Sequence, residues 1–305
     1  MKPASCRPDR SFRRPHPNPD VFRRATISGQ IEKPLKSVRA FQLLSASTIH
    51  SIFGSAPMAW LKQLNRWRRS LRYLLKYRLN RPEWSKQPLI NPVLIVGSAP
   101  VSHKPSGFDD RFFVICINGS QAATEGWNIG PPDVTFLQFN QVRGKGERAV
   151  AVRNALSGKR CGTLHVIRWP EGEQALREGL AAFDYGFDDL RLIGQYHRTR
   201  LAEEVLGRII REGDNEAKFS NGITAVLYAF YNGAPAVVIT GINPFSSGHV
   251  YNSLNKERLH TNMDVEILRE LSNRGFPLFT SDPQVAESVG LRLWTGEAIP
   301  AVRPA

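Results

Sequence analysis

Three side chains that can donate or accept protons lie in one polar segment, residues 243–264: His249, Tyr251 and His260. A histidine titrates near neutral pH and can serve as a general base, and a tyrosine hydroxyl can donate a hydrogen bond to a departing phosphate. The segment follows an apolar run typical of a buried strand, and ligands bind at the ends of such strands in open α/β sheets. It therefore predicts acid–base chemistry, although a surface role is the common one for histidines in loops.

Small and polar residues follow three apolar runs of the sequence. Gly97 and Ser98 come directly after VLIV, Asn118 follows FVICI, and Gly241 and Asn243 follow VVIT. Small residues let a phosphate or ribose approach the backbone, and an Asn amide can pair with a base or a sugar hydroxyl. Turn formation explains the same letters. Neither GxGxxG nor GK[ST] occurs, which disfavours a dinucleotide or Walker-type site.

The run KFSNGITAVLYAFYNG predicts an apolar helix that begins with Ser220, Asn221 and Gly222, with Lys218 just before it. The first N–H groups of a helix have no partner within the helix, so this end can bind an anion. Simple capping by Ser220 is the structural alternative.

Alternating apolar and helical patterns after Pro92 define the elements that must position these residues. We expect strands at 93–96, 112–117, 134–136, 164–167, 236–240 and 276–279, and helices at 147–156, 173–182, 201–211, 221–232, 264–274 and 283–289. Alternation of this kind is typical of a Rossmann-like α/β domain, with a mostly parallel sheet and helices on both faces. We assign residues 86–305 to it.

The composition, with 305 residues and 41% hydrophobic content, suits a globular chain. Three scattered cysteines predict a reduced, cytoplasmic protein without a thiolate metal site. The net charge of +14 is unevenly distributed, because the first 90 residues hold 19 of the 41 Lys and Arg but only 4 of the 27 Asp and Glu. The remainder is nearly neutral and shows no basic stripe interleaved with aromatics, so we expect no nucleic-acid partner.

Residues 1–57 are expected to be a disordered basic leader, since they are rich in Arg and Pro and poor in large apolar residues. An organelle transit peptide, or a native start at Met58, are the alternatives. Residues 40–61 lack charge but contain too many polar residues to be a convincing membrane span.

Residues 58–85 predict a basic amphipathic helix and a linker. The apolar stripe comprises Trp60, Leu64, Trp67, Leu71 and Leu74, and six cations cover the rest of the helix before Pro82 ends it. We expect residues 60–79 to bind an anionic membrane surface, which would hold the protein peripherally on the inner face of the membrane. Packing of the stripe on the α/β domain is the alternative.

The order of the motifs over about residues 92–290 resembles the bacterial sialyltransferases of glycosyltransferase family forty-two. That order is strand-GxxPxS, strand-CxN, SNG-helix, strand-TGIN, a loop Tyr, and His-x-x-x-Asp at the start of a helix. The resemblance implies a Rossmann-like fold, a CMP-activated sialic acid as donor, inversion at the anomeric centre, and no metal or other cofactor.

The resemblance also implies nucleotide-sugar-binding residues. Gly97 and Ser98 correspond to the first nucleotide-contacting turn, where Asn is usual in place of Ser98, and Asn118 corresponds to a donor-binding Asn. Asn221 and Gly222 stand where the family has Ser-Gly.

Other positions carry the implied chemistry. Lys218 stands where the family can have Arg, and Gly241 and Asn243 follow the last strand, with Asn243 in place of an Asp. Tyr251 matches one of two tyrosines that hold the leaving phosphate, and Phe245 replaces the other. His260 matches the general base.

These residues predict a membrane-associated glycosyltransferase for surface polysaccharide or glycolipid synthesis. It would transfer sialic acid or a related ulosonic acid from a CMP-activated donor to a glycan or glycolipid. The replacements at Asn243 and Phe245 favour one alternative, a catalytically inactive carbohydrate-binding or scaffold protein. A second is a Mg²⁺-dependent pterin diphosphotransferase, whose metal ligands would be Asp109, Asp110 and Asp133.

Overall fold

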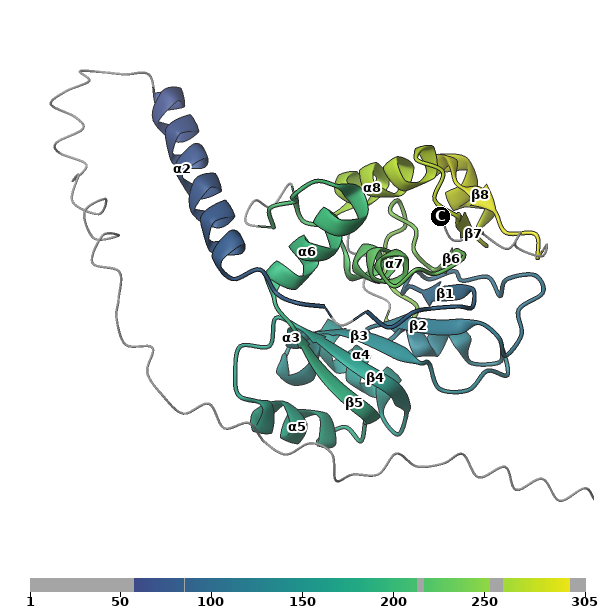
Figure 1. Ribbon diagram of the computed structural model, residues 1–305. Helices are drawn as coiled ribbons and strands as arrows, with labels where there is room; N and C mark the ends of the chain where they lie inside the picture. The colour runs from purple at the N-terminus through teal and green to yellow at the C-terminus, as the bar shows by residue number, and fades with distance from the viewer. Residues whose placement is uncertain (1–57, 85, 213–216, 253–259, 297–305) are drawn as a thin grey trace, which may run out of the picture. The chain divides into compact units, whose positions relative to one another are not determined.

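The structure is a computed structural model that describes residues 58–84, 86–212, 217–252 and 260–296 (Figure 1). The chain divides into two compact units, Met1–Leu61 and Lys62–Ala305. Of the first unit, only the start of one helix belongs to the described residues. The expectations for residues 1–57, namely the disordered leader, the transit peptide and most of the candidate span, lie outside them.

Within the described residues, eight parallel strands form a single sheet in the order β5-β4-β3-β2-β1-β6-β7-β8. The strands are β1 (Val93–Val96), β2 (Phe113–Ile117), β3 (Val134–Gln138), β4 (Arg160–Ile167), β5 (Gly186–Ile193), β6 (Val237–Thr240), β7 (Leu278–Thr280) and β8 (Arg292–Leu293). The chain builds outward from β1 to β5 and then returns to the other side of β1 with β6. The strand order therefore reverses between β1 and β6, which is where open α/β sheets bind ligands.

Helices cover both faces of the sheet, as predicted. The helices are α2 (Met58–Leu79), α3 (Phe139–Arg143), α4 (Glu147–Leu156), α5 (Glu173–Ala181), α6 (Gln195–Leu206), α7 (Asn221–Tyr231), α8 (Thr261–Asn273) and α9 (Pro283–Val285), with short 3₁₀ and π turns at Ser120–Thr124 and Ala286–Gly290. Helices α6, α7 and α8 lie near one another in Figure 1, and their apolar side chains form one core with the sheet. Helices α4 and α5 pack on the opposite face.

The alternation of side chains along β1 shows how one strand serves both faces. Val93 and Ile95 are fully buried in the core beneath α7, whereas Leu94 and Val96 belong to a separate core with Trp294 on the other face. A strand that is buried on both sides needs a continuous apolar sequence, and VLIV provides it.

Strands β5 and β8 and helix α3 were not among the expected elements, and helix α6 begins earlier than expected. The reason is clearest for β5 and α6. Strand β5 was not expected, because its outer positions carry Asp188, Asp189 and Arg191 and its apolar run is interrupted. Helix α6 begins at Gln195 rather than at residue 201. The earlier start was not predicted because the first turns of the helix are polar and show no hydrophobic period. Both elements are stabilised by tertiary contacts more than by local pattern.

Helix α2 forms over the predicted region, and two tyrosines attach its C-terminal half to α6. Tyr73 Oη lies 2.5 Å from Thr199 Oγ1, and Tyr77 donates to Glu203, which also pairs with Arg81 at 2.8 Å. The predicted apolar stripe is not this contact surface, because Trp67 and Leu71 stay 62% and 42% exposed. None of the described helices is long and apolar enough to cross a membrane.

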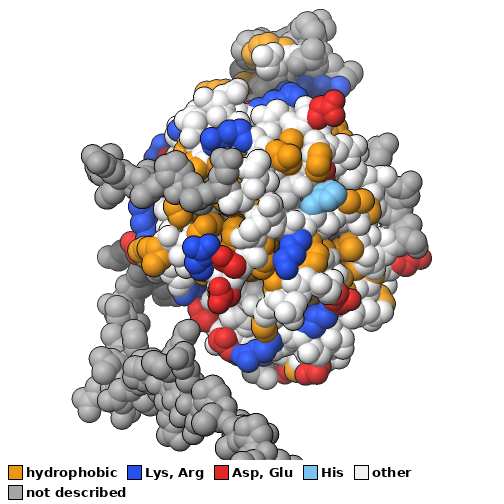
Figure 2. All heavy atoms as spheres, turned by 90° about the vertical axis from the view of Figure 1, so that its right-hand side faces the viewer, with side chains coloured by type: hydrophobic (Ala, Val, Ile, Leu, Met, Phe, Trp, Pro, Cys, Tyr) orange, Lys and Arg blue, Asp and Glu red, His pale blue; other side chains and the backbone are white. Residues whose placement is uncertain are grey.

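On the face shown in Figure 2, basic and acidic side chains are interspersed with hydrophobic ones. This agrees with the nearly neutral charge balance of the chain beyond its first 90 residues.

Candidate active site

A cavity of about 930 Å³ opens at the carboxyl ends of the central strands, where the strand order reverses. It brings together residues that lie far apart in the sequence. Ten of the predicted site residues line it: Gly97, Ser98, Asn118, Lys218, Asn221, Gly222, Gly241, Asn243, Tyr251 and His260. His249 lines it as well, so the parallel sheet gathers the polar residues that follow its strands.

The turn after β1 holds the loop that carries His249 and Tyr251. Ser98 Oγ lies 3.0 Å from His249 Nδ1, and the Ser98 carbonyl accepts the Val250 N–H at 3.0 Å. The rings of His249 and Tyr251 are parallel within 3°, with centroids 5.2 Å apart. Tyr251 also lies against Gly119, where a Cβ atom would stand 2.8 Å from the phenol ring. These contacts fix the Tyr251 ring at the cavity wall.

Asn118 adopts the left-handed conformation, with φ of 52°, directly after β2. Its N–H donates to the Phe136 carbonyl at 2.8 Å, and its Oδ1 accepts the Gln138 N–H at 3.0 Å. Since the acceptor oxygen is occupied, and Nδ2 donates to none of the described side chains or carbonyls, Asn118 offers a hydrogen-bond donor to the cavity. A ligand group recognised there must be an acceptor.

The N-terminus of α7 faces the same cavity. Ser220 caps the helix by accepting the Ile223 N–H at 3.3 Å, and its own N–H donates to Asp264 Oδ1 at 2.8 Å. Asn221 and Gly222, the first helical residues, line the cavity. The unpaired N–H groups and the helix dipole make this end suitable for a phosphate.

Four cations line the cavity, of which only Lys218 was predicted; the others are Arg148, Arg168 and Arg198. Arg168 directly follows β4, a position that could have suggested a role by the same logic that selected Asn118. Arg148 and Arg198 lie within helices, and nothing in their local sequence distinguishes them from surface arginines. Together they make the cavity a site for an anionic ligand.

His260 stands at the cap position of α8, and its carbonyl accepts the Asp264 N–H at 2.9 Å. Burial lowers the pKa of His260, and the nearby charges of Arg198 and Lys218 lower it further. Its Nδ1 is buried and has no hydrogen-bond partner in the described part of the chain. A histidine that is neutral at pH 7 can accept a proton, as a general base must.

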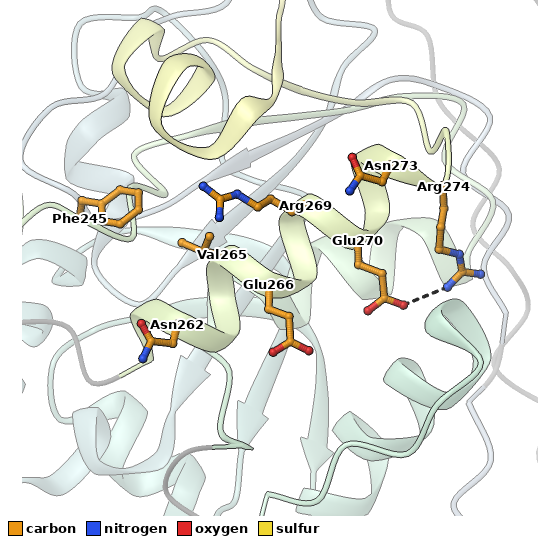
Figure 3. Close-up of a pocket in the computed structure, with 8 residues that line it drawn as sticks. All are labelled: Phe245, Asn262, Val265, Glu266, Arg269, Glu270, Asn273 and Arg274. Atoms are coloured by element: carbon orange, nitrogen blue, oxygen red, sulfur yellow. Dashed lines mark hydrogen bonds and ion pairs between the residues drawn. The ribbon is translucent and has the colours of Figure 1, made fainter.

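Phe245 is the one predicted site residue that does not line this cavity. Its side chain is 53% exposed and lies in a groove of about 850 Å³ along α8, beside Val265 and Arg269 (Figure 3). The expectation that Phe245 occupies a leaving-group position is therefore not met by the geometry.

Asn243 lines the cavity, but its side chain stabilises the loop after β6. Its Oδ1 accepts the Phe245 N–H at 3.0 Å, and its Nδ2 donates to Gln284 Oε1 at 3.0 Å. An Asp here would lack the donor for Gln284. This gives the Asn a structural reason that is independent of catalysis.

The three carboxylates considered as magnesium ligands are not gathered at the cavity. Asp133 precedes β3 and accepts the Val114 N–H at 2.8 Å, and Asp109 pairs with Arg111 at 2.6 Å before β2. These positions belong to the amino ends of the strands, opposite the cavity. Among the described residues, no group of three or more His, Cys, Asp or Glu could hold a metal ion.

The fold and the site define a Rossmann-like α/β protein with a cationic cavity at its topological switch point. No family model matches the sequence, and no curated protein matches it. Several solved structures resemble the fold at low sequence identity.

Three of the solved structures similar to this chain are sialyltransferases. One is CstII from Campylobacter jejuni in complex with the substrate analogue CMP-3FNeuAc, with 13% identity, 68% of this chain and 87% of that chain covered, and a TM-score of 0.41. Another is the monofunctional α-2,3-sialyltransferase Cst-I from Campylobacter jejuni, with 12% identity, coverage of 72% and 86%, and a TM-score of 0.44. A third is CST-II in complex with a trisaccharide acceptor and CMP, with 13% identity, coverage of 68% and 89%, and a TM-score of 0.40. At these identities and scores the likeness concerns the fold and assigns no substrate.

Proposed function

We propose that this protein is an inverting glycosyltransferase that transfers sialic acid or a related ulosonic acid from a CMP-activated donor to a glycan or glycolipid. The observation that carries the proposal is the convergence, in one cavity, of a helix N-terminus, a cluster of cations, and His260 with a lowered pKa. The first two features suit a phosphate, and the third suits deprotonation of a hydroxyl.

The proposed nucleotide lies against the turn at Gly97 and Ser98, with Asn118 donating to an acceptor atom of the base or ribose. Its phosphate lies at the N-terminus of α7, near Lys218. This arrangement follows the general position of ligands in open α/β sheets and the donor character of the lining groups.

In the proposed reaction, neutral His260 takes the proton from an acceptor hydroxyl. The acceptor oxygen attacks the anomeric carbon on the face opposite the phosphate, so the new glycosidic bond forms with inversion. The bond from the anomeric carbon to the phosphate oxygen breaks, and its electron pair stays on CMP. Tyr251 donates a hydrogen bond to the departing phosphate, and the N–H groups of α7 stabilise its charge.

The positive charge that stabilises the leaving group comes from the chain's own Arg, Lys and backbone groups in this proposal. We therefore expect transfer to proceed in the presence of EDTA. A requirement for Mg²⁺ would favour the pterin diphosphotransferase alternative.

The decisive experiment is thermal unfolding of the full chain with CMP, UMP, GMP and ATP, each with EDTA. A ligand at 100 times its dissociation constant stabilises the folded state by about 2.7 kcal/mol. We expect CMP to raise the melting temperature most. Stabilisation by a pterin with ATP and Mg²⁺, but not by CMP, would contradict the proposal. CMP binding without transfer from CMP-sialic acid to any glycan of an acceptor panel would identify the inactive carbohydrate-binding alternative.

We also propose peripheral association with the cytoplasmic face of a membrane, through residues 60–79 of α2. The support is the exposure of Trp67, Leu71 and Leu75 on a helix that also carries six exposed or partly exposed cations before Arg78. An apolar stripe flanked by basic residues is typical of helices that lie in an anionic bilayer surface. Such a position would bring the cavity to membrane-linked acceptors used in surface polysaccharide or glycolipid synthesis.

A further inference from the structure

A buried ion-pair network lies behind one wall of the cavity. Glu212 is shielded from solvent and pairs with two arginines: Arg198 Nη1 forms an ion pair with its Oε1 at 3.0 Å, and Arg168 Nη2 donates a hydrogen bond to its Oε2. Arg168 and Arg198 are among the residues that line the cavity, whereas Glu212 is not. The two cations outnumber the one anion in this network, and Asp264, which also lines the cavity and interacts electrostatically with Arg198, offsets part of their charge.

The network is rigidly supported. Arg198 is 5% exposed, its guanidinium stacks 4.5 Å from the centre of the Phe219 ring, and its Nη2 donates to the Phe219 carbonyl. Its Nε is buried without a hydrogen-bond partner among the described residues. Burial of charge and of unpaired donors is costly unless a counter-ion compensates it.

Arg168 presents the accessible end of the network. It adopts a left-handed backbone conformation, with φ of 61°, which is unfavourable for a residue with a long side chain, and its N–H donates to the Ile193 carbonyl at 2.7 Å. Its side chain is 30% exposed. Nη2 binds Glu212 and Nε is buried without a hydrogen-bond partner in the described segments, while Nη1 donates to none of the described groups, which leaves an available donor on a residue that lines the cavity.

The network of Arg168, Arg198 and Glu212 adjoins the proposed phosphate site. The Phe219 carbonyl that Arg198 holds is followed directly by Ser220, the cap of α7. In an activated ulosonic acid, the carboxylate and the phosphate ester oxygen are attached to the same anomeric carbon. Such a donor needs two neighbouring anion sites, and a neutral hexose donor has no carboxylate to place in the second.

We propose that Arg168, positioned by Glu212 and Arg198, binds the carboxylate of the donor sugar and selects an ulosonic acid over a neutral sugar. This inference rests on the proposed function and assigns the part of the cavity that recognises the sugar rather than the nucleotide. A guanidinium suits the role, because Nη1 can donate a charge-assisted hydrogen bond to the carboxylate while Nη2 stays bound to Glu212.

The test is calorimetric titration of the full chain with CMP and with a 3-fluoro analogue of CMP-sialic acid. In Arg168→Gln we expect the affinity for the analogue to fall about 10- to 100-fold, the usual effect of losing a hydrogen bond between charged groups. The affinity for CMP should change less than about threefold, since the carboxylate belongs to the sugar. Arg168→Lys, which keeps the charge but not the planar fork, should give an intermediate loss.

Glu212→Gln tests the positioning role. Glu212 does not line the cavity, so the Glu212→Gln variant can affect ligand binding only through the two arginines. This variant should therefore shift the ratio of the two affinities in the same direction as Arg168→Gln. Arg191→Gln is the matched control: Arg191 lies in the neighbouring strand β5, pairs with Asp189 at 2.8 Å and does not line the cavity. It should leave both affinities unchanged.

The outcomes separate this inference from the proposed function. If the unaltered protein binds CMP, and Arg168→Gln or Arg168→Lys weakens CMP and the analogue equally, Arg168 is a phosphate ligand and this inference is wrong while the proposed function stands. Unchanged affinities in both variants would also overturn it. If the unaltered protein binds neither ligand, the proposed function itself fails.

Discussion

Gly97 and Gly241 approach each other so closely that a Cβ atom at Gly97 would lie 2.2 Å from the Gly241 carbonyl oxygen. The backbone bonds continue past the strand ends, with the Gly97 N–H donating to Thr240 at 2.7 Å and the Ala99 N–H donating to Gly241 at 2.8 Å. Glycine at both positions suggested room for a ligand, but it is already required by the close packing of the two turns against each other. Gly241 also needs its left-handed φ of 60°.

Gly97→Ala should destabilise the protein by about 1–3 kcal/mol or more, because the backbone atoms around Gly241 cannot move aside as a flexible side chain would. Denaturant unfolding measures the loss. Gly146→Ala is the control, since Gly146 has φ of −73° and nothing within 4 Å of an added Cβ. Equal stability of the two variants would contradict the close packing of the turns.

His260→Ala should lower turnover about 10²- to 10⁴-fold while CMP binding stays nearly intact, because a general base acts on the acceptor rather than on the nucleotide. Single-turnover rates and CMP titration provide the two readouts. A parallel loss of both would show that His260 binds the donor instead.

The pH profile of kcat tests the same residue. Because burial and the neighbouring cations lower the pKa of His260 below its ordinary value of 6.5, the acidic limb of the profile should lie below pH 6.5. Protonation removes the base, so activity should fall as the pH decreases. An acidic limb above pH 7 would contradict this assignment.

Tyr251→Phe should reduce turnover more than donor affinity, since the phenol is proposed to act on the charge that develops in the transition state. The parallel contact with His249 should survive, because the ring is kept. Phe245→Tyr is the control: its side chain lies outside the cavity, so the added hydroxyl should neither raise activity nor rescue Tyr251→Phe. Equal losses of turnover and donor affinity in Tyr251→Phe would indicate ground-state binding.

Because His165 is buried, we expect the stability of the folded protein to decrease at acidic pH. His165 is fully buried against Phe136 and Tyr228, and burial lowers its pKa to about 3. Between pH 6.5 and 3 the unfolded chain binds a proton that the folded chain does not, so the free energy of unfolding should fall by about 1.4 kcal/mol per pH unit as the pH decreases. In His165→Leu this contribution should disappear. Identical pH slopes for the two proteins, from denaturant unfolding at pH 7, 6 and 5, would contradict it.

The double variant Trp67→Ser/Leu71→Ser should bind anionic vesicles more weakly than the unaltered chain, because it removes apolar surface while keeping every cation. Flotation with phosphatidylglycerol vesicles at low and high salt measures this, and binding of the unaltered chain should weaken with salt. Leu293→Ser, which removes an exposed leucine outside α2, is the control. An unchanged bound fraction in the double variant would exclude the stripe as the membrane contact.

The central sheet was predictable because its strands are apolar on both faces and end in small or polar residues. Val93 and Ala236 each open such a run, and the parallel arrangement then places the residues that follow at one edge. This simple geometry is why Asn118 and Gly241, far apart in the sequence, could be assigned to one site before the structure was known.

The ion-pair network could not be predicted in this way. Arg198 lies in a polar helical turn and Glu212 in an irregular segment, and their burial depends on how α6 packs against the loop before α7. The local sequence carries no sign of that contact. Phe245 shows the converse, since a match in motif order placed it in the cavity but the loop directs it to α8.

The outermost strands of the sheet have a consequence for the protein's behaviour at high concentration. β8 is only two residues long, and β5 carries exposed Asp188 and Asp189 with Arg191 along its outer edge. Edge strands that are long, flat and uncharged can pair with strands of other molecules. Short length at one edge and charge at the other discourage that pairing, so the described sheet is protected against edge-to-edge aggregation even though its interior strands are among the most hydrophobic segments of the chain.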